Sequence, residues 1–313
     1  MSAVPPRVYL VVATYRRPAL LRRLLESLRS EAGDLAGVVV VNNSGDAETA
    51  AVATAACPVP LQLMTPPTNL GTGGGLAAGM EAVLATPDAT HLWILDDDAS
   101  ATPGALRAMM AALQKSGAGA AVPLVTDAEG KLAWFPGPLP EPAWSAVRAP
   151  GATPASFRAA YGEDPLGWSW APWPSLLVTR AAVAQAGLPR ADFWFQGEDI
   201  EWTLRLTACA EGVLAPAALC IHTPPGSGGE FEAREHRKRI LMLQNNFFTG
   251  NLAHGRRLRR HAPGNVWRTL RAARFSPKAC QQVLQAWWRG AVRRRAAGQA
   301  GGDGFRREWE SAM

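Results

Sequence analysis

The chain has 313 residues, of which 48% are hydrophobic and 19% are charged. This composition excludes a disordered chain, and the length suits one large folded domain or one domain with an appendage. The formal net charge of +6 is unevenly distributed. Residues 1–233 contain 14 basic and 22 acidic residues, a net of −8, whereas residues 234–313 contain 18 basic and 4 acidic residues, a net of +14.

Short apolar runs alternate with segments of helical periodicity from the N-terminus onward. The first helix has Pro18 in its first turn and leucines at helical spacing. Apolar strands that alternate with helices predict a mostly parallel, twisted α/β sheet with helices on both faces. The predicted strands are residues 7–15, 37–45, 60–65, 90–95, the first part of 175–187, and 213–226. The predicted helices are residues 18–30, 47–56, 75–86, 102–114, the second part of 175–187, and 197–212. Residues 130–175 are rich in Pro and Trp and are predicted to form loops over the site.

Residues 1–229 are predicted to form this domain, and residues 230–313 a basic, Trp- and Arg-rich helical region. Arginine clusters alternate there with Trp267, Phe275, Trp287 and Trp288. Basic helices with aromatic faces suit an anionic membrane surface. The alternative is a solvated helix pair that packs on the main domain; nucleic acid is not expected as a partner, and self-pairing into an oligomer stays possible.

Features that would take the chain across a membrane are not found in the sequence. No apolar run approaches the roughly 18 residues needed to span a bilayer, and residues 1–18 do not resemble a signal peptide. Cysteines 57, 209, 220 and 280 have no metal-type spacing. We therefore expect a cytoplasmic protein with reduced thiols, peripheral on the inner face of the plasma membrane.

Three aspartates, Asp96, Asp97 and Asp98, follow the predicted strand 90–95 directly. Ligands bind beyond the carboxyl ends of parallel strands, and crowded carboxylates there favour a hard divalent cation, Mg²⁺ or Mn²⁺. Such an ion usually completes its shell with phosphate oxygens. The alternative is that Asp97 and Asp98 only cap the next helix, although Thr102 and Pro103 already supply that cap.

A glycine-rich segment, NLGTGGGLAAGM, precedes the predicted helix 75–86. Glycines before a helix let backbone N–H groups approach an anion, but a flexible turn is also possible. Further on, Glu198 and Asp199 begin a predicted helix, whose dipole is expected to keep a catalytic base ionised. Phe193 and Trp194 before them offer apolar faces that suit sugar rings.

These segments, taken together with His222 at the end of the last strand, resemble family-two glycosyltransferases of the GT-A fold. The motifs that carry the resemblance are VVATYRRPALLRRLLESL, VVVVNNSGD, NLGTGGGLAAGM, LDDDA, GEDIEWTLR and APAALCIHTPP. Within the family the chain resembles bacterial galactofuranosyl- and rhamnosyltransferases. The clustered tryptophans favour the galactofuranosyl branch.

The resemblance implies a metal-dependent, inverting transfer of galactofuranose from UDP-galactofuranose to a lipid-linked or polysaccharide acceptor in cell-envelope synthesis. It implies Asp199 as the base and Asp96, Asp98 and His222 as ligands of Mn²⁺ or Mg²⁺. The implied donor-binding residues are Thr14, Arg16, Asn43, Asn69, Gly71, Gly73, Gly74 and Asp97. The implied acceptor-binding residues are Trp168, Trp170, Trp173, Trp194 and Glu198. Rhamnosyl transfer from dTDP-rhamnose is the alternative within the family; a nucleotidyltransferase or a non-catalytic binding module for sugar nucleotides or glycans are those outside it.

Overall fold

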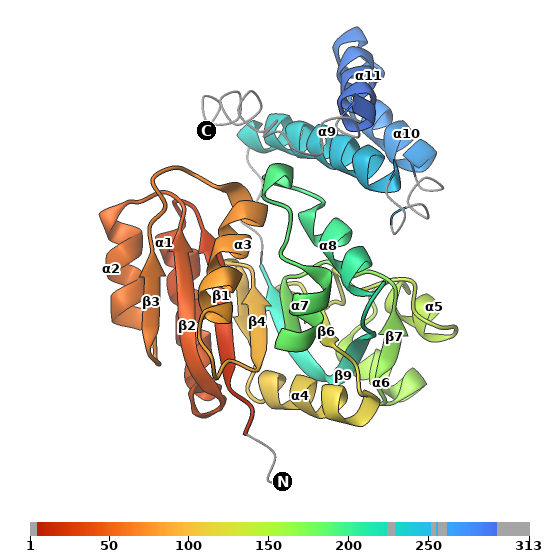
Figure 1. The fold of residues 1–313 in the computed structure, drawn as a ribbon. Helices are drawn as coiled ribbons and strands as arrows, with labels where there is room; N and C mark the ends of the chain where they lie inside the picture. The colour runs from red at the N-terminus through yellow and green to blue at the C-terminus, as the bar shows by residue number, and fades with distance from the viewer. Residues whose placement is uncertain (1–4, 224–228, 252–254, 256–261, 293–313) are drawn as a thin grey trace.

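The computed structural model describes residues 5–223, 229–251, 255 and 262–292. Its N-terminal half is a set of parallel strands in the order β3-β2-β1-β4 (Figure 1). Helices connect these strands along the chain, as the alternation of apolar and amphipathic segments predicts. The strands are β1 (Val8–Thr14), β2 (Leu35–Asn42), β3 (Leu61–Met64) and β4 (His91–Leu95), and the helices are α1 (Pro18–Ser27), α2 (Ala47–Ala56) and α3 (Gly71–Leu84).

The second half extends the same sheet, but with mixed directions. Strand β8 (Ser175–Thr179) runs antiparallel to β4 and to β6 (Ala120–Thr126), and β9 (Gly212–His222) runs parallel to β6. Two three-residue strands, β5 (Ala99–Ala101) and β7 (Leu166–Trp168), pair with β9 in antiparallel fashion. The described residues thus form a nine-stranded sheet. Its parallel half carries the strand ends beyond which the sequence predicts ligand binding.

Two layers of buried side chains lie on opposite faces of the sheet and confirm the predicted α/β class. One layer joins the strands to α1, α2 and α4 (Ala105–Ser116). The other joins them to α3, α7 (Arg180–Ala186) and α8 (Glu198–Leu206). In β1 the residues alternate between the layers, with Leu10 and Val12 in the first and Val11 in the second, because successive side chains of a strand point to opposite faces.

Residues 130–175, which the sequence predicts to be loops, also contain regular structure. Helices α5 (Ala143–Val147) and α6 (Pro154–Tyr161) and strand β7 lie there. Each is short, so its periodicity is too brief to detect in the sequence. Helix α6 begins at a capping box formed by Thr153 and Ser156, a local signal that the sequence reading missed.

Three helices follow the sheet and lie together beside it: α9 (Gly229–Asn251), α10 (Ala262–Ala272) and α11 (Pro277–Val292) (Figure 1). They share a small core in which Leu243 of α9 packs with Val283 and Ala286 of α11. The predicted helical character is confirmed for these ranges. The arginine-rich stretches 256–260 and 293–295 lie outside the described residues. Over the described ranges, none of the helices has the length and apolar character to cross a bilayer.

Candidate functional site

The carboxyl ends of β1, β2 and β4 open into a cavity of about 650 Å³, which we call the central cavity. Its floor is formed by residues from these strand ends, and one wall by residues 194–200 before and within α8. Helix α9 supplies part of the rim through Lys238, Met242 and Asn246. The position follows the general rule that α/β sheets bind ligands beyond the carboxyl ends of their strands.

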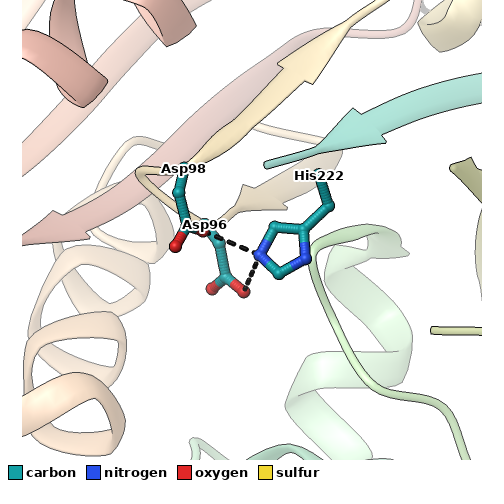
Figure 2. A group of neighbouring side chains, drawn as sticks. All are labelled: Asp96, Asp98 and His222. Carbon is teal, nitrogen blue, oxygen red and sulfur yellow. Dashed lines mark hydrogen bonds and ion pairs between the residues drawn. The ribbon is translucent and has the colours of Figure 1, made fainter. Parts of the chain in front are cut away.

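Asp96, Asp98 and His222 meet in the central cavity and form what we call the Asp-His cluster (Figure 2). Each offers one ligand atom, and these atoms lie within 4.8 Å of one another. The Nε2 atom of His222 is 2.8 Å from an Asp98 oxygen and 4.0 Å from an Asp96 oxygen. Two carboxylates and an imidazole are a donor set that Mn²⁺ accepts.

The backbone brings these residues together from distant parts of the sequence. The aspartates occupy the turn between β4 and β5, and the N–H of Ala99 donates to the Asp96 carbonyl at 3.0 Å. Strand β5 pairs with β9 so that Ala99 lies opposite His222. Arg23 of α1 fixes the turn from behind by donating to the Asp98 carbonyl at 3.1 Å.

The electrostatics of the Asp-His cluster suit a bound cation. Burial raises the pKa of Asp96 well above its usual range, and repulsion from Asp98 and Asp97 adds to the effect. Burial also opposes ionisation of Asp98, but hydrogen bonding and charge attraction from His222 and then Arg17 leave its pKa lowered. A divalent cation would relieve the repulsion at Asp96, so the residues present fit a metal ion.

Thr14 and Arg17 hold the middle aspartate. The Thr14 hydroxyl donates to Asp97 Oδ2 at 2.7 Å, and Arg17 Nη1 donates to Asp97 Oδ1 at 2.9 Å and lies 3.3 Å from Asp98 Oδ2. Burial raises the pKa of Asp97, although Arg17 opposes the shift. Thr14 and Asp97, two of the predicted donor-binding residues, both line the central cavity.

The arginine of this motif requires a correction, because Arg17 and not Arg16 faces the aspartates. Arg16 has a φ of 53° and does not line the central cavity; its guanidinium lies over the Tyr15 ring. The positive φ turns the backbone at Arg16, so the next side chain is directed at Asp97 and Asp98. The sequence alone does not show which of these two adjacent arginines faces the aspartates.

The glycine-rich segment also requires a correction. Helix α3 begins at Gly71, so the glycines lie inside its first turns and are not a loop before it. A Cβ at Gly71 would lie 2.1 Å from the Trp194 carbonyl oxygen, and one at Gly73 would lie 2.8 Å from that of Arg190. A Cβ at Gly74 would also be crowded, because it would lie 3.0 Å from the Leu70 side chain. These glycines let the chain before α8 pack on α3; of the three, only Gly71 lines the central cavity.

Two asparagines hold the start of α3. The Asn43 amide donates to the Gly71 carbonyl at 3.0 Å, and its oxygen accepts from the Leu70 N–H at 3.3 Å. Asn69 accepts from the Gly71 N–H at 2.8 Å. Both asparagines line the central cavity, and their bonds to the backbone also give them a structural role.

Glu198 and Asp199 line the cavity at the start of α8, after Gly197 with its φ of 88°. Burial raises the pKa of Asp199 to about 6, although the Ile200 N–H donates to its carboxylate. Burial, together with the charge of Asp199, raises the pKa of Glu198 to about 8. The dipole of α8 does not keep the pKa of Glu198 at its usual value, because burial outweighs it. At neutral pH Asp199 is mostly ionised and Glu198 is mostly protonated.

The four tryptophans predicted to contact an acceptor have different surroundings. Trp194 lines the central cavity, and so does Trp173, although it is buried and packs on Trp202 with ring centroids 5.6 Å apart. Trp168 and Trp170 do not line the cavity. Trp168 belongs to the buried layer that also contains α8 residues, and it packs on Gly212 of β9. A cluster of tryptophans in a sequence can also form part of a buried core, as Trp168 does here.

The sequence reading missed two further groups of cavity residues. Trp134 is 37% exposed and lies edge-on to the His222 ring at a centroid distance of 4.3 Å. Its only signal was its place in the Pro- and Trp-rich segment predicted to cover the site. The α9 residues Lys238, Met242 and Asn246 had no signal, because nothing in a basic helix indicates that it borders a site formed mainly by a preceding sheet.

Known proteins share part of this sequence and the fold of the chain. Residues 9–155 match the family model described as glycosyl transferase family 2. No curated protein sequence matches the chain. The chain resembles the crystal structure of the mannosyltransferase PcManGT from Pyrobaculum calidifontis in complex with GDP-Man and Mn²⁺, with a TM-score of 0.60 and 14% identity over 94% of this chain and 88% of that one.

Two further solved structures share the fold at low identity. They are S. aureus TarS 1-349 in complex with UDP-GlcNAc, with a TM-score of 0.56 and 16% identity over 90% of this chain and 79% of that one, and GalNAc-T7 with UDP, GalNAc and Mn²⁺, with a TM-score of 0.54 and 13% identity over 80% of this chain. The chain spans 48% of the length of the GalNAc-T7 chain.

Proposed function

We propose that the chain is a family 2 glycosyltransferase with the GT-A fold, which transfers a sugar with inversion from a nucleotide-diphosphate donor to a glycan or lipid-linked acceptor; the family match of residues 9–155 and the fold shared with solved transferases support this. One observation carries the proposal: a carboxylate with a pKa of about 6, Asp199, shares one cavity with the Asp-His cluster and Arg17. A base and a diphosphate-binding site are the two parts that such a transfer requires.

In the proposed reaction Asp199 accepts the proton of an acceptor hydroxyl. The hydroxyl oxygen bonds to the anomeric carbon of the donor from the side opposite the diphosphate, and the bond from that carbon to the diphosphate oxygen breaks. The electron pair leaves with the nucleoside diphosphate. A base with a pKa near neutral is both ionised and able to hold a proton at physiological pH, which suits Asp199.

Asp96, Asp98 and His222 would hold a divalent cation, which supplies positive charge against the diphosphate leaving group. Arg17 lines the cavity beside them and adds a second positive charge on the same side. Thr14, Asn43 and Asn69 occupy the strand-end region where we place the nucleotide. Arg17 replaces Arg16 in this assignment.

The acceptor hydroxyl is assigned to the wall formed by Trp194, Glu198 and Asp199. Glu198 is mostly protonated at neutral pH, so it can donate a hydrogen bond to an acceptor oxygen while Asp199 accepts the proton. Trp173 and Trp194 remain the candidates for contact with sugar rings among the four tryptophans.

The function is tested by donor binding and turnover with purified protein. The panel contains UDP-galactofuranose, dTDP-rhamnose, UDP-GlcNAc and GDP-Man, each with Mn²⁺ and with a chelator. We propose UDP-galactofuranose as the donor because aromatic residues crowd the acceptor wall. Metal-dependent binding of one donor that is lost in Asp98→Ala, with turnover lost in Asp199→Asn, supports the transferase. Binding that survives Asp199→Asn without turnover in either protein supports a non-catalytic binding module.

We also propose that α10 and α11 hold the protein on an anionic membrane, where a lipid-linked acceptor is found. Residues 262–292 contain five basic and no acidic residues. The large hydrophobic side chains that are most exposed lie in the same stretch, and they are Trp267, Phe275, Leu284, Trp287 and Trp288. Exposed aromatic rings beside arginines suit the headgroup region of a bilayer.

Sedimentation with vesicles tests the membrane proposal. Wild-type protein is expected to bind vesicles that contain an anionic lipid and to bind phosphatidylcholine vesicles weakly. The double variant Trp287→Ser and Trp288→Ser should lose binding, whereas Trp134→Ser, an exposed tryptophan in the central cavity, should not. Equal binding by both variants would contradict the assignment of this surface.

A further inference from the structure

The turn that precedes the base-bearing helix has an unusual backbone. Trp194, Gln196 and Gly197 have φ angles of 40°, 66° and 88°, all in the left-handed region. A non-glycine residue in that region costs on the order of 1–3 kcal/mol and persists only when its surroundings hold it in place. Asp199 is two residues beyond the turn, so the conformation of the turn sets where its carboxylate lies.

Asn245 of α9 reaches this turn from outside the sheet domain. Its side chain is 1% exposed, and its amide nitrogen lies 3.3, 3.2 and 2.6 Å from the carbonyl oxygens of Phe193, Phe195 and Gln196. From the other side the Gly73 N–H donates to the Trp194 carbonyl at 3.3 Å. The four consecutive carbonyls 193–196 are therefore held between α9 and α3.

We propose that Asn245 is a positioning residue of the transferase, which fixes the turn 194–197 and thereby places Trp194 and Asp199 for the acceptor. The proposal deepens the proposed function and rests on it. The Asn245 amide nitrogen supplies two N–H donors to carbonyls that converge on one buried point, whereas a hydrophobic side chain of the same size supplies none. Asn245 does not line the central cavity, so it acts through the turn and not by contact with a substrate.

The packing of α9 on the turn does not depend on this amide. The Phe193 and Phe248 rings are 5.5 Å apart, and the Arg190 guanidinium lies 4.9 Å from the Phe248 ring centroid. Loss of the Asn245 amide should therefore leave α9 in place and free the turn. The Asp-His cluster lies in the turn after β4 and at the end of β9, and Arg17 directly precedes α1, so donor binding should be little affected.

Asn245→Leu tests the proposal, with Thr249→Val as its matched control. Thr249 is also buried on α9, one turn further along, and its hydroxyl has no hydrogen-bond partner in the part of the chain that the structure describes. We expect kcat to fall on the order of 100-fold in Asn245→Leu, because small displacements of catalytic groups have effects of this size. Donor affinity should change by less than about threefold, and Thr249→Val should resemble the wild type in both respects.

Hydrogen exchange of the backbone amides of residues 194–199 gives a readout independent of turnover. Exchange should become faster in Asn245→Leu and stay unchanged in Thr249→Val and in Asp199→Asn, although Asp199→Asn also loses turnover. Unchanged exchange in Asn245→Leu, or a parallel fall in kcat and donor affinity, would overturn the proposal. Asn245→Ala serves the same purpose if the leucine variant does not fold. Absence of transfer by the wild type would refute the proposed function, while the exchange result would still decide the role of Asn245 in the turn.

Discussion

Replacement of Arg17 by alanine should destabilise the protein in a way that depends on pH and on Mn²⁺. Arg17 is 26% exposed and bonds Asp97 at 2.9 Å, with Asp98 at 3.3 Å. Removing one partner of a buried ion pair costs about 3–5 kcal/mol, and partial exposure together with the remaining Thr14 bond to Asp97 reduces this to about 2–3 kcal/mol. At about 2–4 °C per kcal/mol, Tm should fall by about 5–10 °C at pH 7.5.

The pH dependence follows from Asp97. Burial raises the pKa of Asp97, and Arg17 now opposes that shift. Without Arg17 the pKa of Asp97 rises further. As the pH falls from 7.5 toward 5, Asp97 becomes protonated in the variant and no longer needs a cationic partner. The loss of Tm relative to wild type should therefore become smaller. Mn²⁺ should reduce the loss of Tm as well, because a cation held by Asp96 and Asp98 neutralises negative charge beside Asp97.

Thermal denaturation of Arg17→Ala and Arg16→Ala at both pH values, with and without Mn²⁺, checks the reasoning. Arg16 is the matched control, since it is the adjacent arginine and its side chain lies over Tyr15. Equal losses of Tm in the two variants, or a deficit in Arg17→Ala that changes with neither pH nor Mn²⁺, would refute the role assigned to Arg17.

Three more predictions concern the cavity. Asp199→Asn should lower kcat on the order of 10³-fold with donor affinity retained, measured by turnover and calorimetry, and a loss of donor affinity instead would place Asp199 in donor binding. In wild-type protein kcat/KM should rise as the pH rises through about 6, because burial raises the pKa of Asp199 to that value and the base must be deprotonated; a flat profile between pH 5 and 7 would exclude it as the base. Gly71→Ala should unfold more easily in urea than Gly104→Ala, because both glycines have positive φ but only at Gly71 would a Cβ overlap the Trp194 carbonyl, and equal midpoints would contradict that packing.

The N-terminal half of the fold could be predicted because its signals are local. Each of the strands β1 to β4 is a short apolar run, and α1 carries leucines at helical spacing after Pro18. The second half could not be predicted in the same detail, since the direction of β8 and the pairing of β5 with β9 depend on contacts across the sheet. Those contacts leave no periodic trace in a three-residue strand.

The site shows the same division between local and distant causes. Asp96, Asp98 and Asp199 could be proposed from the sequence because acidic residues follow a predicted strand and begin a predicted helix, and because the family resemblance implies roles for them. The sequence does not show which of the adjacent residues Arg16 and Arg17 faces the aspartates, because this depends on the positive φ angle of Arg16. Trp168 was assigned to an acceptor because composition cannot distinguish a tryptophan packed on Gly212 from one that lines a cavity.

The pairing of β5 with β9 also has a consequence for the order in which the protein forms during synthesis. Asp98 and His222 are 124 positions apart, and their contact depends on docking of the strand at the end of the sheet domain. Contacts of such long sequence separation form late, because closing the loop costs entropy before the contact can repay it. A nascent chain can therefore complete the parallel strands β1 to β4 while its Asp-His cluster still lacks the histidine. Asn245 emerges from the ribosome later still, so an incomplete chain should lack both the third residue of the Asp-His cluster and the amide that holds the turn 194–197.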